Sequence, residues 1–289
     1  MKEYKIENHA SSYLPESKNW KLVWHDEFDG TELDRTKWDF RRHFWGRESK
    51  TWTEDGTSVS DGALHLALVK KGDDFYSAHL QTGSLVYDIP KDTDKMWPFG
   101  KFVEPKFMHK FGYYEIRCKL PKNDGWHAAF WLQAPGIGSH PDPKYCGVEC
   151  DIMENYLQAS EGKIICGNGW GGYGKDSKWF GHFEFPFIET DDGWHTYAVD
   201  WNRDGYIFYA DGNEIGRQMA PECPVSEVEQ FICVSTECHG YNRVFSNECK
   251  TASAAGDALY WNLKPVETLK KAVLPDEFTV DYVRVFDEV

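Results

Sequence analysis

The stretch that decides the fold is GVECDIMENY, residues 147–156, which carries three carboxylates in an otherwise apolar run. Side chains alternate between the two faces of a β-strand, so Glu149 and Asp151 share a face. Glu154 lies five positions after Glu149 and falls on the other face by this alternation. One extra residue bulged between Asp151 and Glu154 restores the common face. The stretch therefore predicts a bulged strand with all three acids on one side.

This arrangement suits a two-carboxylate hydrolysis. After the bulge, Glu149 and Glu154 are four effective positions apart, about 13 Å between Cα atoms at ~3.3 Å per residue. Glutamate side chains that lean toward one another can approach the carboxyl separation of about 5–5.5 Å found in retaining glycosidases. Like charges raise the pKa of at least one group, which gives an ionised nucleophile and a protonated acid, with Asp151 placed to orient the nucleophile. A solvated strand face and a Ca²⁺ site with three oxygen ligands also fit the spacing. The spacing by itself does not distinguish among these three interpretations.

Outward from this stretch, the chain shows many short alternating or apolar segments separated by turn residues such as DG, NDG, PG and RDG. Tyr206–Asp211 followed by Gly212 is a strong hairpin signal. Helical periodicity is nearly absent, with its best candidate at 265–273. We predict one all-β domain over 1–289, a sandwich of curved sheets, in which the long segment 88–110 lines a functional surface. The predicted strands are KLVWHDEF, ALHLALV, GYYEIRCKL, AAFWLQ, GVECDIME, KIICGNG, HTYAVDWN, GYIFYADG, QFICVST and FTVDYVRVF.

The amino-acid composition narrows the classes of binding partner and the cellular location that we expect for the protein. A net charge of −15 argues against nucleic acid and anionic membranes, which both need positive potential. Thirteen Trp and 15 Tyr exceed what a core usually needs and suggest flat surfaces for sugars or protein partners. No apolar run reaches the roughly 20 residues of a membrane span, and no secretory signal is visible in this chain. Several of the eight cysteines lie in apolar runs, which favours reduced thiols and a cytoplasmic location; a secreted protein without its leader would look the same.

At the acid trio the chain resembles glycoside hydrolase family 16, whose bulged branch carries E-x-D-x-x-E. Other segments are similar to family strands and follow the family order along the chain. They are LVWHDEFDG (22–30), DGALHLAL (61–68), GYYEIRCKLP (112–121), AAFWLQ (128–133), DGWHTYAVDW with DGYIFYADG (192–212), and FTVDYVRVF (278–286).

The resemblance implies a β-jelly-roll sandwich of two curved antiparallel sheets with a concave cleft. It also implies retaining hydrolysis of an internal β-glycosidic bond. We expect the protein to be a monomer. Glu149 would be the nucleophile, Glu154 the acid and base, and Asp151 the assistant of Glu149. The bulged spacing lies nearer to laminarinases, agarases and other galactanases than to lichenases or transglycosylases. We expect a β-1,3-glucan as substrate, with a β-galactan, possibly sulfated, as the alternative. A non-catalytic carbohydrate-binding protein is the rival class, and the presence of both glutamates argues against it.

Several residues near the predicted cleft are candidates for substrate binding. By alternation, His127 and Trp131 share a face, and Trp131 is the better sugar platform. The segment RRHFWGR (41–47) is a basic cluster, either an ordinary surface or a subsite for a charged sugar. The segment STECHGY (235–241) puts two further polar residues on one face, where an exposed strand is an equal alternative. The full candidate set is Trp131, His127, Trp126, Trp45, Arg47, Asn168, Trp170, Glu237 and His239.

The family resemblance also implies a structural Ca²⁺ on the convex side. Its ligands would be Glu27, Asp281 and the backbone carbonyl of Gly62. The two acids lie 254 positions apart and are otherwise interpretable as plain surface acids. No cofactor is expected for catalysis.

Overall fold

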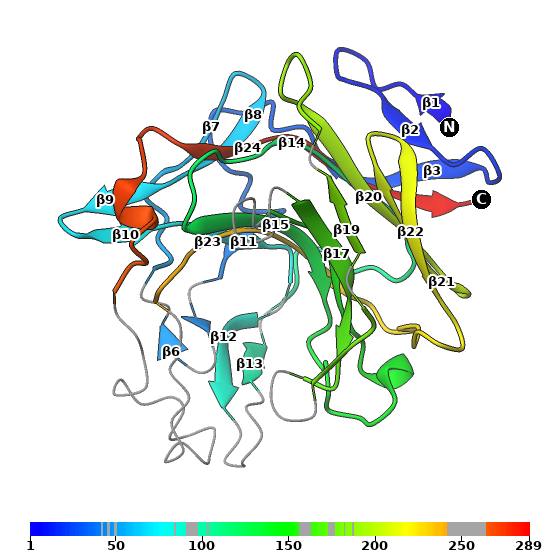
Figure 1. The fold of residues 1–289 in the computed structure, drawn as a ribbon. Coiled ribbons are helices and arrows are strands. Elements are labelled where there is room, and N and C mark those ends of the chain that lie inside the picture. The colour runs from blue at the N-terminus through cyan, green and yellow to red at the C-terminus, as the bar shows by residue number, and fades with distance from the viewer. Residues whose placement is uncertain are drawn as a thin grey trace.

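In the computed structural model, two large antiparallel sheets pack face to face, with short hairpins on both outer sides (Figure 1). The two layers are called the acid-bearing sheet and the second sheet below. Side chains are not described for the short hairpins within 43–48 and 85–102. The structure describes residues 1–41, 43–44, 47–48, 51–83, 85–90, 98–102, 104–155, 163–172, 177–181, 183–186, 188–241 and 264–289.

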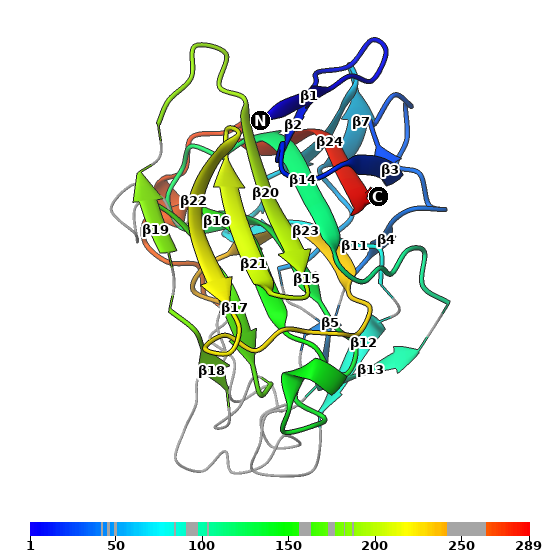
Figure 2. The same ribbon diagram turned by 90° about the vertical axis from the view of Figure 1, so that its right-hand side faces the viewer.

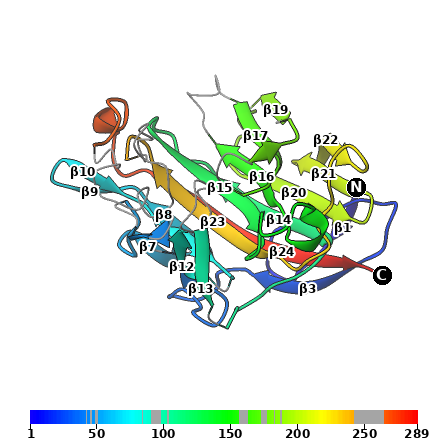
Figure 3. The ribbon, with the colours of Figure 1, turned by 90° about the horizontal axis from the view of Figure 1, so that it is seen from below.

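The acid-bearing sheet contains the GVECDIMENY stretch near its middle, and Figure 3 shows β17, β16, β15 and β23 following one another across it. β19 (Phe183–Pro186) pairs with β17 beside the main order. That order is β18 (Lys178–Trp179), β17 (Lys163–Trp170), β16 (Glu149–Asn155), β15 (Trp126–Gln133), β23 (Phe231–Cys238), β11 (His79–Gln81) and β4 (Asp39–Phe40).

The second sheet covers one face of the first, and Figure 2 shows its strands β22, β21, β20 and β14 side by side. β3 (Trp20–Asp26) pairs with β24 beside the main order. That order is β22 (Asn213–Met219), β21 (Gly205–Ala210), β20 (His195–Asn202), β14 (Gly112–Lys119), β24 (Glu277–Glu288), β8 (Ala63–Ala67) and β7 (Thr57–Ser60).

The main core lies between the two sheets because each strand sends alternate side chains inward. Phe130 and Leu132 of β15 face Tyr114 and Ile116 of β14 across this core, and all four are fully buried. A smaller cluster around Tyr113 and Phe286 lies on the far face of the second sheet. The N-terminal hairpin of β1 (Lys2–Tyr4) and β2 (Ser12–Leu14) covers it, with Leu14 buried.

Further hairpins flank the sheets. β5 (His43–Phe44) with β6 (Arg47–Glu48), and β12 (Leu85–Pro90) with β13 (Pro98–Phe102), lie on the side of the acid-bearing sheet that faces away from the second sheet (Figures 1 and 2). β9 (Val69–Lys71) pairs with β10 (Asp74–Tyr76). The helical elements described are two short 3₁₀ turns, η1 (Pro143–Tyr145) and η3 (Leu269–Lys271).

The sequence predictions for the fold are largely confirmed. Each predicted strand segment contains an observed strand, and the architecture is the predicted sandwich of antiparallel sheets. The predicted hairpin turns at Asp211 and Gly212, whose φ values of 47° and 72° are those of a tight two-residue turn. The expected helix at 265–273 shortens to η3. The segment 88–110 is not one irregular loop, because β13 pairs back onto β12 within it.

The described cysteines agree with the prediction of reduced thiols. Seven are free and buried, and Cys249 lies outside the described residues. Among the described residues, no helix has the length and apolar character that crossing a membrane requires.

Candidate active site

The bulge predicted in the acid-bearing strand is present. Along β15, Gln133 pairs with Glu149, Trp131 with Asp151, and Ala129 with Glu154. These three β15 residues are two positions apart and share one face, so their partners on β16 do as well. The register shift that makes this possible lies between Asp151 and Glu154 on both sides of β16.

The bulge also keeps the apolar residues of the strand in the core. Cys150, Ile152 and Met153 are completely buried between the two sheets. Two consecutive residues at the bulge therefore face inward, and the acids face away from the second sheet. The same bulge therefore keeps the apolar side chains in the core and places all three acids on the opposite face of the sheet.

Burial differs among the three acids. Asp151 is buried, whereas Glu149 and Glu154 on either side of it are partly accessible. Burial raises the pKa of Asp151 well above its ordinary value, and the negative charges of Glu154 and Glu149 raise it further. Asp151 consequently holds its proton to higher pH than an ordinary aspartate does.

Trp131 pairs with Asp151 and lies on the acid face, which it shares with His127 as the strand alternation predicts. Its ring is partly exposed, and its Nε1 donates a hydrogen bond to Ser235 Oγ at 3.0 Å. The ring of His79 from β11 lies against it with centroids 5.5 Å apart. The indole is therefore held by neighbours on two strands.

Three more predicted residues come together on the acid face. His127 pairs across the strands with Glu237, and its Nδ1 shares a 2.8 Å hydrogen bond with Nε2 of His239. Burial lowers the pKa of both histidines, which favours two neutral rings. One ring then donates its N–H to the unprotonated nitrogen of the other. Burial raises the pKa of Glu237 to about 7, although the positive charge of Arg41 acts to lower it.

Arg41 is a residue of this face whose position the sequence did not reveal. It is buried rather than lying along the surface, and its Nη1 donates a 2.7 Å hydrogen bond to Oε1 of Gln133, the cross-strand partner of Glu149. The only sequence signal for it was the basic cluster at 41–47. His79, also missed, is buried, and its pKa is held well below its ordinary value first by burial and then by Arg41 and His127.

The predictions for three residues are wrong. Trp126 faces away from His127, is buried in a separate apolar cluster, and donates from Nε1 to Asp276. Asn168 pairs with Cys150 and points between the sheets, where its Nδ2 donates to Gln218 Oε1 at 2.7 Å. Trp170, two residues on, packs against the same core. In each case the alternation of the strand directs the side chain to the opposite face.

Two further predicted residues are not tested. Trp45 lies outside the described residues. Arg47 belongs to β6, but its side chain lies outside what is described. Two hollows of about 650 and 720 Å³ lie elsewhere on the molecule and are lined by none of the predicted site residues.

The sequence model of the glycosyl hydrolases family 16 matches residues 46–226. The chain belongs to this family.

Two relatives share limited sequence identity with this chain. It is 27% identical over 211 residues to a glucan endo-1,3-beta-glucosidase A1 of Niallia circulans, covering 66% of this chain and 28% of that protein. It is 33% identical over 147 residues to beta-porphyranase D of Zobellia galactanivorans, covering 49% of this chain and 31% of that protein. The match therefore spans less than a third of the length of either relative.

Solved structures agree with the family 16 fold. The catalytic domain of an endo-1,3-beta-glucanase (laminarinase) from Thermotoga petrophila superposes with a TM-score of 0.62 at 22% identity, covering 94% of this chain and 99% of that one. A non-specific endo-beta-1,3(4)-glucanase named SCLam gives a TM-score of 0.65 at 19% identity, covering 96% and 95%. The predicted jelly-roll sandwich is confirmed.

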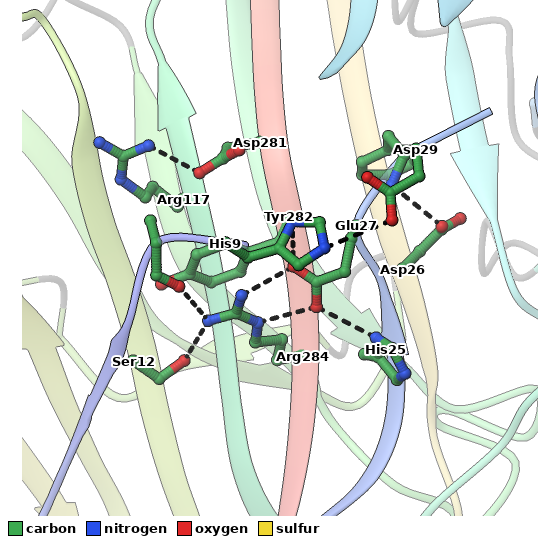
Figure 4. Close-up of polar contacts among 12 residues, drawn as sticks. His9, Ser12, His25, Asp26, Glu27, Asp29, Arg117, Asp281, Tyr282 and Arg284 are labelled. Atoms are coloured by element: carbon green, nitrogen blue, oxygen red, sulfur yellow. Dashed lines mark hydrogen bonds and ion pairs between the residues drawn. The ribbon is translucent and has the colours of Figure 1, made fainter. Parts of the chain in front are cut away.

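The predicted Ca²⁺ ligands do not fit a cation site in their present arrangement. Arg284 donates to both carboxylate oxygens of Glu27, Nε to Oε1 at 2.9 Å and Nη2 to Oε2 at 2.7 Å (Figure 4). Asp281 is paired with Arg117 through a 2.6 Å hydrogen bond. Both carboxylates are thus engaged by guanidinium groups, and no metal-binding group of three or more His, Cys, Asp or Glu occurs within the described ranges. Gly62, whose backbone carbonyl is the third predicted ligand, lies in the tight turn between β7 and β8 and has a φ of 73°.

Proposed function

We propose that the chain is an endo-acting, retaining β-glycanase that hydrolyses internal β-1,3 linkages of a glucan. The observation that carries the proposal is the common face shared by Glu149, Asp151 and Glu154 across the bulge of β16. Membership of family 16 and the likeness to a glucan endo-1,3-beta-glucosidase support the same activity.

In the first step, a carboxylate oxygen of Glu149 attacks the anomeric carbon of the sugar. Glu154 donates its proton to the glycosidic oxygen, so the bond from the anomeric carbon to that oxygen breaks and the leaving sugar departs as an alcohol. A glycosyl ester on Glu149 is left behind. To Asp151, whose pKa is raised by burial and by the two glutamates, we assign the orientation of Glu149 during this step.

In the second step, Glu154 is a carboxylate and removes a proton from water. The water oxygen attacks the anomeric carbon and displaces Glu149, which regains its carboxylate form. Two inversions at the same carbon give net retention of the β configuration. The cycle returns both glutamates to their starting protonation states.

A β-galactan is the second candidate substrate. The 33% identity to a beta-porphyranase favours it, together with the buried guanidinium of Arg41 on the acid face. A guanidinium recognises anionic oxygens through forked hydrogen bonds, as a sulfated sugar would require.

The test is a hydrolysis screen on laminarin, mixed-linkage glucan, agar, carrageenan and porphyran, with products sized by chromatography and the new anomeric centre followed by NMR. We expect mid-length oligosaccharides from laminarin at early times, with β products formed first. Cleavage of porphyran or agar alone would move the assignment to the galactan.

The rival class predicts a different result. A non-catalytic carbohydrate-binding protein would be retarded in a polysaccharide gel and would release no reducing ends. Such an outcome with folded protein would overturn the proposed hydrolysis.

A further inference from the structure

An exposed tryptophan that the catalytic scheme does not use lies beside Glu149. Trp179 belongs to β18, the last strand of the acid-bearing sheet. It pairs with Gly169 of β17, and Gly169 in turn pairs with Glu149 of β16. The side chain of Trp179 is 41% exposed, so its ring is accessible to a ligand.

The indole of Trp179 covers the acid face of the sheet. Gly169 has the same strand parity as Gly167, the partner of Asp151, so a side chain at 169 would point to the acid face. A Cβ built at Gly169 would lie only 2.8 Å from the ring of Trp179. The ring therefore lies directly over Gly169, where only a glycine leaves room for it.

The segment after Trp179 fixes the ring in this position. The Phe180 amide donates to the carbonyl of Asn168 at 3.1 Å, and Phe180 itself packs against the main core. Nε2 of Gln218, from the second sheet, donates to the carbonyls of Phe180 at 2.6 Å and Gly181 at 2.8 Å. A ring held in this way loses little conformational entropy when a ligand binds to it.

From this geometry we infer that Trp179 is a sugar-binding platform, on which a pyranose ring of the substrate stacks next to Glu149. The apolar C–H face of a pyranose matches the flat face of an indole. Neighbouring strands are ~4.8 Å apart, so a ring over Gly169 lies about one strand spacing from the position of Glu149. The inference rests on the proposed function, because it takes Glu149 as the point of bond cleavage.

The platform also assigns a direction to the substrate. Trp131 lies on the β15 side of β16, and Trp179 lies on the opposite side, over β17. A glycan that contacts both rings runs across the strands, and the acids lie between its two contacts. Aromatic rings then bind sugar units on both sides of the cleaved bond, and binding on both sides suits endo cleavage.

The experiment measures hydrolysis of laminarin oligosaccharides of increasing length, labelled at the reducing end, by the wild type and by Trp179→Ala. We expect kcat/KM of the variant to fall roughly tenfold for oligosaccharides long enough to reach the ring. The shortest cleaved substrates should be affected little, and the preferred cleavage position should shift along the longer ones. Trp179→Phe, which keeps a flat ring, should retain most of the activity.

Two further variants separate stacking from loss of structure. Gly169→Ala should displace the ring and reproduce the loss, with the melting temperature reporting whether the fold is intact. Trp194→Ala is the matched control, because that indole packs against Arg117 and Lys119 on the second sheet, away from the acids. Its kinetics should equal those of the wild type.

Retardation in gels containing laminarin or porphyran gives a readout that does not need catalysis. An active wild type with Trp179→Ala unchanged in KM, cleavage position and retardation would overturn the platform alone. An inactive wild type that is retarded through Trp179 would overturn the proposed hydrolysis and keep the platform. A wild type with neither property would overturn both.

Discussion

Two regions of this molecule bury carboxylates in opposite ways. On the acid face, Asp151 is buried between two other acids; burial raises its pKa, and the negative charges of Glu154 and Glu149 raise it further. On the far face of the second sheet, Glu27 is equally buried, but Arg284 donates to both of its oxygens. Both carboxyls are buried to a similar degree, so the two sites differ in the sign of the neighbouring charge: two acids flank Asp151, whereas a guanidinium engages Glu27.

The difference shows what each region contributes. The guanidinium of Arg284 also donates to the carbonyl of Ala10 and to Ser12 Oγ, and lies 3.5 Å from the centre of the Tyr282 ring. It therefore joins the N-terminal segment to β24 and satisfies its own buried donors (Figure 4). In the acid trio, by contrast, bringing like charges together costs free energy. Such a cost is typical of sites kept for chemistry.

The largest effect should come from the acids proposed as catalytic. Glu154→Gln should lower kcat on laminarin by about 10²–10⁴-fold, the usual range for a lost proton transfer. An aryl β-glycoside, whose leaving group needs no proton, should recover its first step in this variant. Glu149→Gln should be inactive on both substrates. Equal behaviour of the two variants on the aryl glycoside would contradict the assigned roles.

The next largest effect should be on stability. Arg284→Met leaves the buried Glu27 carboxylate with its contacts to His25 and His9 but without its guanidinium partner, which should cost about 3–5 kcal/mol in urea unfolding. The double variant Arg284→Met/Glu27→Leu removes both charges and should recover much of this loss. Arg217→Met removes an exposed ion pair with Glu214 and serves as the control, with no measurable change expected. A double variant no more stable than the single one would mean that the ion pair is not the source of the cost.

A smaller effect is expected at the partly exposed aromatic ring beside Asp151. Trp131→Ala should weaken substrate binding by about 1–3 kcal/mol, the range for a lost aromatic anchor. Steady-state kinetics on laminarin measure this as a rise in KM. An unchanged KM would remove Trp131 from the substrate site.

A pH-dependent effect should appear at Glu115, which is buried beside Tyr282 under the N-terminal hairpin. Burial raises its pKa from 4.5 to about 7, so the folded state binds the proton more tightly than the unfolded state. Wild-type stability that this group supplies at low pH is lost as the pH rises from about 4.5 to about 7. Glu115→Gln should therefore gain stability relative to the wild type across this interval in urea titrations. A difference that does not change with pH would contradict the raised pKa.

The smallest expected effect concerns calcium. Because Arg284 and Arg117 engage the two carboxylates proposed as ligands, EDTA should leave the melting temperature unchanged, and added Ca²⁺ should do the same. A calcium-dependent rise in melting temperature would show that the arginines give way to a cation. Asp281→Asn would then abolish that rise.

The sequence by itself determined the strands, the hairpin at Asp211–Gly212 and the bulge at the acids, because these follow from local alternation and turn chemistry. It also determined the family, since the acid spacing and the order of the strands are properties of the chain. Only the tertiary structure decided which side chains join the acids. Arg41 reaches Gln133 from 92 positions away, and Trp179 covers Gly169 through strand pairing. The tertiary structure also decided that Asn168 points between the sheets and that Glu27 pairs with Arg284. Contacts between distant strands depend on register and packing, which no local sequence pattern encodes.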